Sequence, residues 1–341
     1  MIDTDRISER YRERAIRVDP RQLLVTNFKG TEQERDLTEP PNCEGFGRLR
    51  HFKRETSLGW PQNPLPIDPA LARLGRPRAD SLRAQVFQNA VCNWRCWYCF
   101  VPFDLLAANR EHSSWKTPAE LVDLYLNQEE PPQVIDLTGG QPDLTPEWVP
   151  WMMEELASRG FSDRTFLWSD DNLSNDYFWR FLSPAQRNVV VEYSNYGRVG
   201  CFKGFDPISF GFNTKADPVL FAQQFELFGR HVAEGVDAYA YVTLTTPVDT
   251  NIPRLMANFV DRLQRIDLAL PLRTVPLEIQ VFSPVLGRIG PAQEQALRHQ
   301  WNAVEVWNEE LQRRFTPAER AMPIHEVPLR RKPSSITQRH D

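Results

Sequence analysis

The stretch AQVFQNAVCNWRCWYC (residues 84–99) places three cysteines directly after a segment that is expected to form a β-strand. The strand is predicted over residues 84–91, and Cys92, Cys96 and Cys99 follow it on one short loop. Three thiolates on one tight loop can converge on a single metal centre. Ligands of α/β proteins bind at the carboxyl ends of the strands, so this position favours a metal or cofactor site.

The cysteine count points to the same use. The chain has five cysteines, and the remaining two, Cys43 and Cys201, stand alone. Disulfide frameworks of secreted domains usually have an even number of cysteines spread along a short chain. We therefore expect no such framework, a reducing cytoplasm, and thiolates that are kept for a metal.

Strand and helix segments alternate from about residue 83 onward. Strands are predicted at 84–91, 134–140, 165–170, 198–203, 237–245 and 277–285. Helices are predicted at 117–128, 145–160, 173–182, 218–235, 251–266 and 291–315. About six β/α units joined by short turns predict an α/β fold with a parallel sheet, as a partial or a complete barrel.

Residues 1–80 have a different character. Four prolines between residues 61 and 69 exclude a long helix or a central strand there. We expect a loop-rich extension that wraps the main domain at 81–290, followed by a C-terminal helix and a frayed tail at 291–341. The extension and residues 277–290 are expected to form the substrate side of the barrel.

Composition excludes several classes of protein. The chain of 341 residues is 41% hydrophobic and 25% charged, as in globular proteins, and its net charge of −5 gives no argument for nucleic acid. No apolar run of about 18 residues is present, so no membrane span is expected, and the N-terminus does not resemble a secretory signal. Common hydrolase and P-loop motifs are missing, and His231 and His299 are expected at the surface.

Two kinds of metal centre fit the cysteine loop. A structural zinc site normally has four ligands, and the fourth would have to be His112, Cys43 or Cys201, none of which stands at a familiar spacing. Such a zinc site would be a non-catalytic staple of the barrel. Three cysteines alone suit a [4Fe–4S] cluster with one iron left open, and the spacing favours this second centre.

The Cys-x3-Cys-x2-Cys spacing, with an aromatic residue before the last cysteine, resembles the radical S-adenosylmethionine (radical SAM) superfamily. The resemblance covers about residues 84–285. It implies a partial (β/α)6 barrel whose Cys92, Cys96 and Cys99 hold a [4Fe–4S] cluster, with SAM on the open iron. It also implies an oxidoreductase-type enzyme that cleaves SAM reductively to a 5′-deoxyadenosyl radical, which abstracts hydrogen from the substrate. Tyr98 would pack beside the adenine, and flavodoxin or ferredoxin would supply the electron.

A glycine motif follows the second predicted strand. Thr138-Gly139-Gly140-Gln141 precedes a proline where the family usually has Gly-Gly-Glu-Pro, which meets the methionine amino group of SAM. Glycines let a backbone approach a ligand closely, and the Gln141 carbonyl can accept a hydrogen bond although it carries no charge. The alternative is a simple glycine turn between strand and helix.

Two further motifs resemble SAM-binding segments. The segment SDDN (169–172) stands where relatives have Thr-Asn-Gly near the SAM ribose, so Asn172 is a candidate ligand; a helix N-cap turn is the alternative. Cys201-Phe202-Lys203 resembles the Asp-x-Lys pattern of pyruvate formate-lyase activating enzymes, with Lys203 against the SAM carboxylate. Cys201 replaces the acid, as a buried small hydrophobe or as a thiol that faces the substrate.

The substrate is not named by these motifs. In the style of its motifs, the chain is closest to the single-cluster branch that resembles activating enzymes for glycyl-radical proteins. Cys43 and Cys201 are too few for a second cluster. A small molecule, a peptide or a protein substrate fits equally well. No catalytic residue beyond the cofactor site is assigned.

Overall fold

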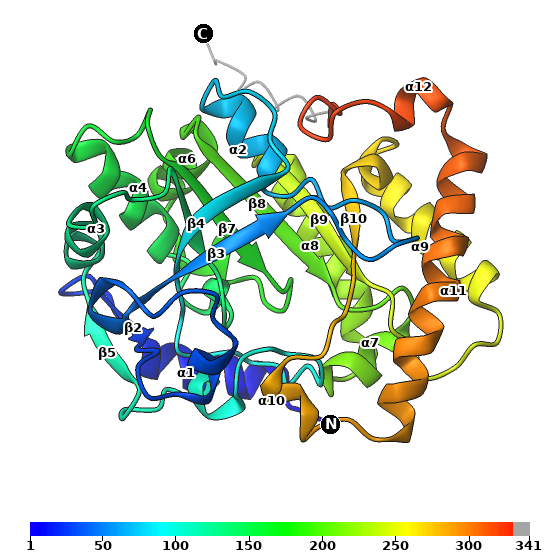
Figure 1. Cartoon of the computed structure of the whole chain (residues 1–341), viewed down its shortest axis with the longest axis horizontal. Helices are drawn as coiled ribbons and strands as arrows, with labels where there is room; N and C mark the ends of the chain where they lie inside the picture. Colours follow the sequence, from blue (N-terminus) through cyan, green and yellow to red (C-terminus); the bar gives the residue numbers. More distant parts are fainter. Residues whose placement is uncertain (330–341) are drawn as a thin grey trace, which may run out of the picture.

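A computed structural model describes residues 1–329 of the chain, so all but the first two residues of the tail that was predicted to fray, 328–341, lie outside the described residues. The centre of the fold is a seven-stranded sheet, in which all neighbours from β4 to β10 are parallel and β3 is antiparallel to β4. Figure 1 shows this sheet curling into an open half-barrel. Its spatial order is β10 (Thr274–Leu277), β9 (Ala238–Thr243), β8 (Tyr196–Phe202), β7 (Phe166–Asp171), β6 (Val134–Leu137), β4 (Ser81–Phe87) and β3 (Gly47–Lys53).

A smaller antiparallel sheet lies beside the first one, in the order β1 (Ile16–Arg17), β2 (Gln22–Thr26) and β5 (Ser113–Lys116). The helices are α1 (Thr4–Ala15), α2 (Ile67–Arg73), α3 (Pro118–Leu126), α4 (Trp148–Ser158), α5 (Tyr177–Phe181), α6 (Pro184–Glu192), α7 (Pro207–Thr214), α8 (Leu220–Glu234), α9 (Ile252–Ile266), α10 (Ser283–Leu286), α11 (Pro291–Arg314) and α12 (Pro317–Arg320). Short 3-10 turns are η1 (Glu32–Asp36), η2 (Cys43–Gly45), η3 (Phe103–Leu106), η4 (Pro142–Leu144) and η5 (Leu270–Arg273).

Capping residues account for several helix starts. Thr117 caps α3 with Glu120 in a capping box, and Pro118 occupies the first turn, as the sequence predicts. The next Thr-Pro pair was predicted to start a helix at residue 145, but α4 begins at Trp148. Thr145 does not cap it, because its hydroxyl accepts a hydrogen bond from Asn89 at 2.9 Å.

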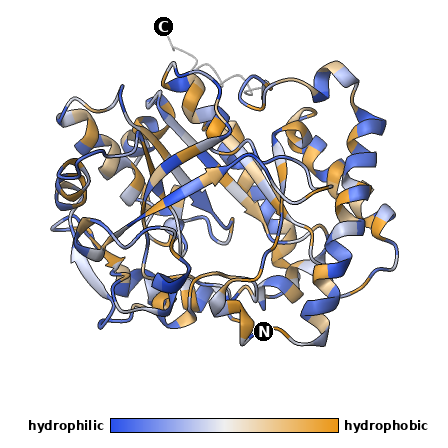
Figure 2. Cartoon of the chain, in the orientation of Figure 1, coloured by the Kyte–Doolittle hydropathy of each residue, from blue (hydrophilic) through white to orange (hydrophobic). Residues whose placement is uncertain are grey.

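Helices cover the outer face of the sheet. Buried apolar side chains of α3, α4 and α6 pack on β4, β6 and β7, and those of α8, α9 and α11 pack on β8 and β9. Helix α9 shows the pattern clearly, because Ile252, Met256, Phe259 and Leu263 are buried at helical spacing. Hydrophobic and hydrophilic residues alternate along these helices in Figure 2, as expected of amphipathic helices.

The opposite, inner face carries a separate apolar cluster. Ala84, Val199, Cys201 and Tyr241 belong to it, together with Ile67 of α2. Strand β3 is supplied by the first eighty residues, which therefore contribute an edge strand to the main sheet as well as loops. No helix among residues 1–329 has both the length and the apolar composition that crossing a membrane requires.

One strand prediction was wrong. Residues 277–285 were expected to be extended, but β10 ends at Leu277 and residues 283–286 form α10. The side chain of Gln300 on α11 explains the ending. Its amide donates to the Ile279 carbonyl and accepts from the Ile279 N–H, both at 3.1 Å, so these backbone groups are not available for a strand ladder. Helices α6 and α7 were also not predicted.

Candidate functional site

The cysteine loop lies at the carboxyl end of β4, as predicted. Cys92 and Cys96 are buried, Cys99 is half-buried, and all five cysteines of the chain are free thiols. The loop is tight, because the Cys99 N–H donates to the Cys96 carbonyl at 3.0 Å. It is the one place on the described chain where three thiols share a loop.

Burial makes these thiols weaker acids than an exposed cysteine. It raises the pKa of all three, and that of Cys96 reaches about 12, with Cys92 and Cys99 adding to the rise. Thiols with such pKa values stay protonated at neutral pH unless a metal takes the place of the proton. A buried group of three thiols therefore fits a metal centre better than an exposed redox site.

The spacing of the sulfur atoms bears on the size of that centre. Sulfur ligands of a single zinc ion lie about 3.8 Å apart, from Zn–S bonds of about 2.3 Å in a tetrahedron. The three sulfurs do not all lie within 4.8 Å of one another in the part of the chain that the structure describes. Cys43 is no fourth ligand, since its thiol points to the Leu124 carbonyl at 3.5 Å on the outer side of the sheet. As the structure places them, these four cysteines do not form a tetrahedral zinc site.

The N-terminal helix α1 holds the cysteine loop in place. Its contacts are Trp94 Nε1 to Thr4 Oγ1 (3.1 Å), Asn93 Nδ2 to Ser8 Oγ (2.9 Å) and Arg95 Nη2 to the Tyr11 hydroxyl (2.7 Å). The extension was expected to act on the substrate side, but its first helix also supports the candidate metal loop. Sequence reasoning missed this contact because no residue of α1 forms a motif with the cysteines.

Two other segments brace the same loop. The Trp97 indole donates to Asn213 Oδ1 at 2.9 Å, and Asn213 Nδ2 donates in turn to the Lys203 carbonyl at 2.9 Å. Arg288 donates to the Cys99 carbonyl at 2.6 Å. Helix α7 and the segment after α10 thus tie β8 and the C-terminal part of the chain to the cysteines.

The Gly-Gly turn lies directly against the cysteine loop. Gly139 and Gly140 have φ values of +76° and +66°, which other residues adopt only with strain. A Cβ on Gly140 would overlap the carbonyl oxygens of Asn89 and Val91, and one on Gly139 would overlap the side chain of Gln88. Both glycines are therefore needed by the packing of two protein loops, quite apart from any ligand.

Gln141 links this turn to the carboxyl end of β7, the third parallel strand of the sheet. Its buried side chain accepts from the Asn172 N–H at 2.9 Å and donates to Asp171 at 2.9 Å. Asn172 in turn points its side-chain amide at the Cys92 sulfur, 3.6 Å away. The structure thus brings Gln141, Asn172 and Cys92 together in one chain of contacts.

Tyr98, Thr138 and Lys203 lie toward the inner face. The Tyr98 hydroxyl is 3.1 Å from Thr243 Oγ1, and the Thr138 hydroxyl donates to Asp170. Burial lowers the pKa of Lys203, whereas Cys201, Tyr98 and the cysteine loop raise it when they carry negative charge, and the net shift is upward. The lysine thus lies next to the three thiols, where it suits an anionic group.

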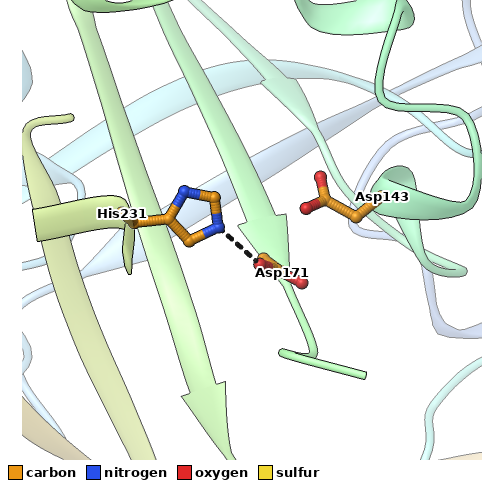
Figure 3. Close-up of side chains that lie close together, drawn as sticks. All are labelled: Asp143, Asp171 and His231. Atoms are coloured by element: carbon orange, nitrogen blue, oxygen red, sulfur yellow. Dashed lines mark hydrogen bonds and ion pairs between the residues drawn. The ribbon is translucent and has the colours of Figure 1, made fainter. Parts of the chain in front are cut away.

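His231 was expected at the surface, and this was wrong. It is 2% exposed, and its Nε2 lies 3.3 Å from Asp171, as Figure 3 shows. Asp143 lies beside them and forms a buried ion pair with Arg198. Burial, reinforced by Arg198, lowers the pKa of His231 to about 4, so the imidazole is neutral at pH 7.

These buried groups could be taken for a metal site, because Asp143, Asp171 and His231 have ligand atoms within 4.8 Å of one another. The Arg198 guanidinium already neutralises Asp143, and His231 already pairs with Asp171. We therefore interpret the group as an ion network that anchors α8 and η4 to β7 and β8. His299 is half-buried rather than solvated, with Nδ1 3.0 Å from the Thr246 carbonyl.

Cys201 lies on the inner face of β8, 8% exposed, and burial raises its pKa to about 12. It packs with apolar residues but also interacts with the charges of Lys203 and Asp170, so both interpretations of this thiol remain predictions. Sequence reasoning missed the arginines of β3, Arg48 and Arg50, which share this face. Their spacing of two residues on a strand is the signal that could have revealed them.

Comparisons with known proteins found similarity among solved structures only. No protein-family model matches the chain, and no curated protein matches it either. Among solved structures, SuiB of Streptococcus suis is similar, in one structure bound to S-adenosylmethionine and in another bound to the precursor peptide SuiA. The TM-score is 0.37 at 14% identity, and the match covers 52% of this chain and 36% of SuiB. The match thus spans about a third of the length of SuiB, and a likeness of this size does not show a shared function.

Proposed function

We propose that the chain is a radical SAM enzyme, in which Cys92, Cys96 and Cys99 hold a [4Fe–4S] cluster and SAM binds the fourth iron. The observation that carries the proposal is the Cys-x3-Cys-x2-Cys spacing on a buried loop at the carboxyl end of the first parallel strand. Three free thiols on one loop, with no fourth cysteine among them, support a cluster with one open iron.

When bound, the cluster and SAM would supply reductive cleavage of SAM and a hydrogen-abstracting 5′-deoxyadenosyl radical. The chain's own residues would prepare the site for them. The Asn172 amide donates toward the Cys92 sulfur, and the protonated Lys203 offers a positive charge for the SAM carboxylate. Tyr98, held by Thr243, offers a ring face for the adenine.

Within this proposal the glycine motif acts mainly through positioning. The Gln141 side chain is bonded at both ends, so we assign it the orientation of Asn172 rather than contact with the methionine amino group. Thr138, Gly139 and Gly140 remain candidates for that contact through their backbone groups. Asn172 remains a candidate for the ribose, because its backbone and amide are fixed beside Cys92.

The finer assignment is the single-cluster branch, which resembles activating enzymes for glycyl-radical proteins. Lys203 beside the thiols supports it, and modification of a small molecule or a peptide is the alternative. A one-electron donor such as flavodoxin or ferredoxin and a cytoplasmic location belong to the same proposal. If this chain forms a radical product only when a glycyl-radical protein is present, that result favours the branch of activating enzymes.

The test is anaerobic reconstitution of the full chain with iron and sulfide, followed by reduction in the presence of SAM. We expect about four irons per chain, an electron paramagnetic resonance signal on reduction, and 5′-deoxyadenosine as product. Cys92→Ala, Cys96→Ala and Cys99→Ala should each abolish the signal, whereas Cys43→Ala on the outer side should retain it. One zinc per chain with no reductant dependence would overturn the proposal in favour of a metal staple.

A further inference from the structure

Arg48 of β3 is a buried cation whose hydrogen bonds are incomplete. Its side chain is 6% exposed, and neither Nε nor Nη2 has a partner among residues 1–329. A buried guanidinium is normally paired, because leaving its donors without acceptors is unfavourable. An unpaired one is therefore a sign that a partner is missing from the protein itself.

Arg48 faces the candidate site. It lies opposite Val86 in the β3–β4 ladder, two positions along from the Arg50–Ala84 pair and so on the same face, and Ala84 is on the inner face of the sheet. Its guanidinium carbon is 5.3 Å from the centre of the Phe100 ring. Phe100 directly follows Cys99, so the arginine approaches the residue next to the third cysteine.

Arg50 stands two residues along the same strand and on the same face. It is 31% exposed, and its Nη1 reaches Asp136 Oδ2 at 3.4 Å. The strand therefore presents two guanidinium groups to the inner face. Only one of them has a carboxylate within ion-pair distance in the described chain.

The carboxylates of the inner face do not satisfy Arg48. Asp136 Oδ2 is turned to Arg50, while Asp170 accepts the hydroxyl of Thr138. Both carboxylates lie near enough to act on the charge of Arg48, yet neither accepts a hydrogen bond from its Nε or Nη2. The unmet need on this face is therefore for a hydrogen-bond acceptor at Arg48.

We propose that Arg48 and Arg50 bind an oxyanion group, a carboxylate or a phosphate, of the substrate. The planar guanidinium donates two parallel N–H groups, which match the oxygens of either anion, and Phe100 covers one face of the fork. This inference rests on the proposed function, and it names the substrate class: an anionic molecule whose acidic group lies on the β3 side of the cysteine loop.

The first test measures thermal unfolding of the metal-free full chain at constant ionic strength. Chloride is replaced either by inorganic phosphate or by glutarate, a simple dicarboxylate. We expect the unfolding temperature to rise with the concentration of at least one of them, and the anion that acts identifies the acidic group. Arg48→Met should abolish the rise. Arg83→Gln, an exposed arginine on the neighbouring strand, should keep it.

The variant itself should fold, because Arg48→Met removes a buried unpaired charge and is expected to raise the unfolding temperature without anion. Arg48→Lys, which keeps the charge but loses the fork, should weaken the anion effect without abolishing it. No anion effect in the wild type, or an effect that persists in Arg48→Met, would overturn the subsite.

A second measurement separates substrate from SAM. SAM binding to the reconstituted holoenzyme should be the same in wild type and Arg48→Met; a weaker affinity in the variant would assign Arg48 to SAM and refute the substrate role. If the cluster does not assemble at all, the proposed function fails while the phosphate experiment can still be read. If it assembles and no anion effect is seen, the subsite alone fails.

Discussion

The side-chain amide of Asn172 points at the sulfur of Cys92 from 3.6 Å. Its backbone N–H is held by Gln141 and its carbonyl by Gln224, both buried, so the amide has little freedom to turn away. Hydrogen bonds to ligand sulfur are one of the ways in which a protein sets the potential of an iron–sulfur cluster. The contact therefore links the end of the third parallel strand to the proposed metal centre.

Asn172→Ala should lower the reduction potential of the reconstituted cluster. A hydrogen bond contributes about 1 kcal/mol, which for one electron corresponds to roughly 40 mV. The measurement is a potentiometric titration followed by electron paramagnetic resonance. Asn127→Ala, at the exposed end of α3, is the matched control and should leave the potential unchanged. An unchanged potential in Asn172→Ala, with full iron content, would show that the amide does not act on the cluster.

Gly140→Ala tests the close approach of the two loops. Gly75 has nearly the same backbone, with φ +62° against +66°, but has nothing within 4 Å of an added Cβ. Gly75→Ala should therefore cost about 1–2 kcal/mol of unfolding free energy, from the backbone alone. Gly140→Ala should cost roughly 1–3 kcal/mol more, because its Cβ overlaps the backbone of the cysteine loop, and should reduce iron loading. Urea unfolding of the metal-free variants and iron analysis check both; equal costs at the two positions would contradict the packing argument.

Local signals in the sequence were sufficient for much of the sheet. Strands β6 and β7 are short apolar runs with turn residues behind them, and α3 has a complete capping box, so these elements were predicted within a few residues. The cysteine loop was placed correctly because it follows such a strand directly. These features depend on neighbours in sequence.

The errors arose where distant residues decide the outcome. β10 stops at Leu277 because Gln300, on the next long helix, takes the backbone groups of Ile279. His231 looked like a polar-face residue of α8, but that face meets Asp171 and Arg198 from two strands. Arg48 lacked any local motif, and its importance follows only from its burial with Nε and Nη2 unpartnered among residues 1–329.

Tyr11→Phe tests the support that α1 gives to the cysteine loop. The change removes the hydroxyl that accepts from Arg95 at 2.7 Å, while the ring stays in the core. A loss of about 1 kcal/mol should raise amide hydrogen exchange of residues 92–99 about fivefold. Tyr193→Phe is the matched control, because the buried Tyr193 hydroxyl has no partner among the described residues. Hydrogen exchange with mass spectrometry measures both, and equal protection of the loop in the two variants would contradict a role for α1.

The buried histidine predicts how stability depends on pH. Burial and Arg198 lower the pKa of His231 from 6.5 to about 4 in the folded chain, whereas the unfolded chain keeps the ordinary value. Between these pH values the unfolded state binds more protons, so the free energy of unfolding is fully retained above pH 6.5 and falls as the pH drops toward 4.

His231→Gln should remove this component, since a glutamine amide can still face Asp171 but does not titrate. Other acidic groups also titrate below pH 5, so the informative quantity is the difference in unfolding free energy between wild type and variant at each pH. We expect it to change by roughly 2–3 kcal/mol across the window. His325→Gln, at a histidine that contacts Glu326 outside this ion network, controls for the substitution itself. Parallel curves for wild type and His231→Gln from pH 7 to 4 would mean that the pKa of the imidazole is not lowered in the folded chain, against the effect of its burial and of Arg198 beside it.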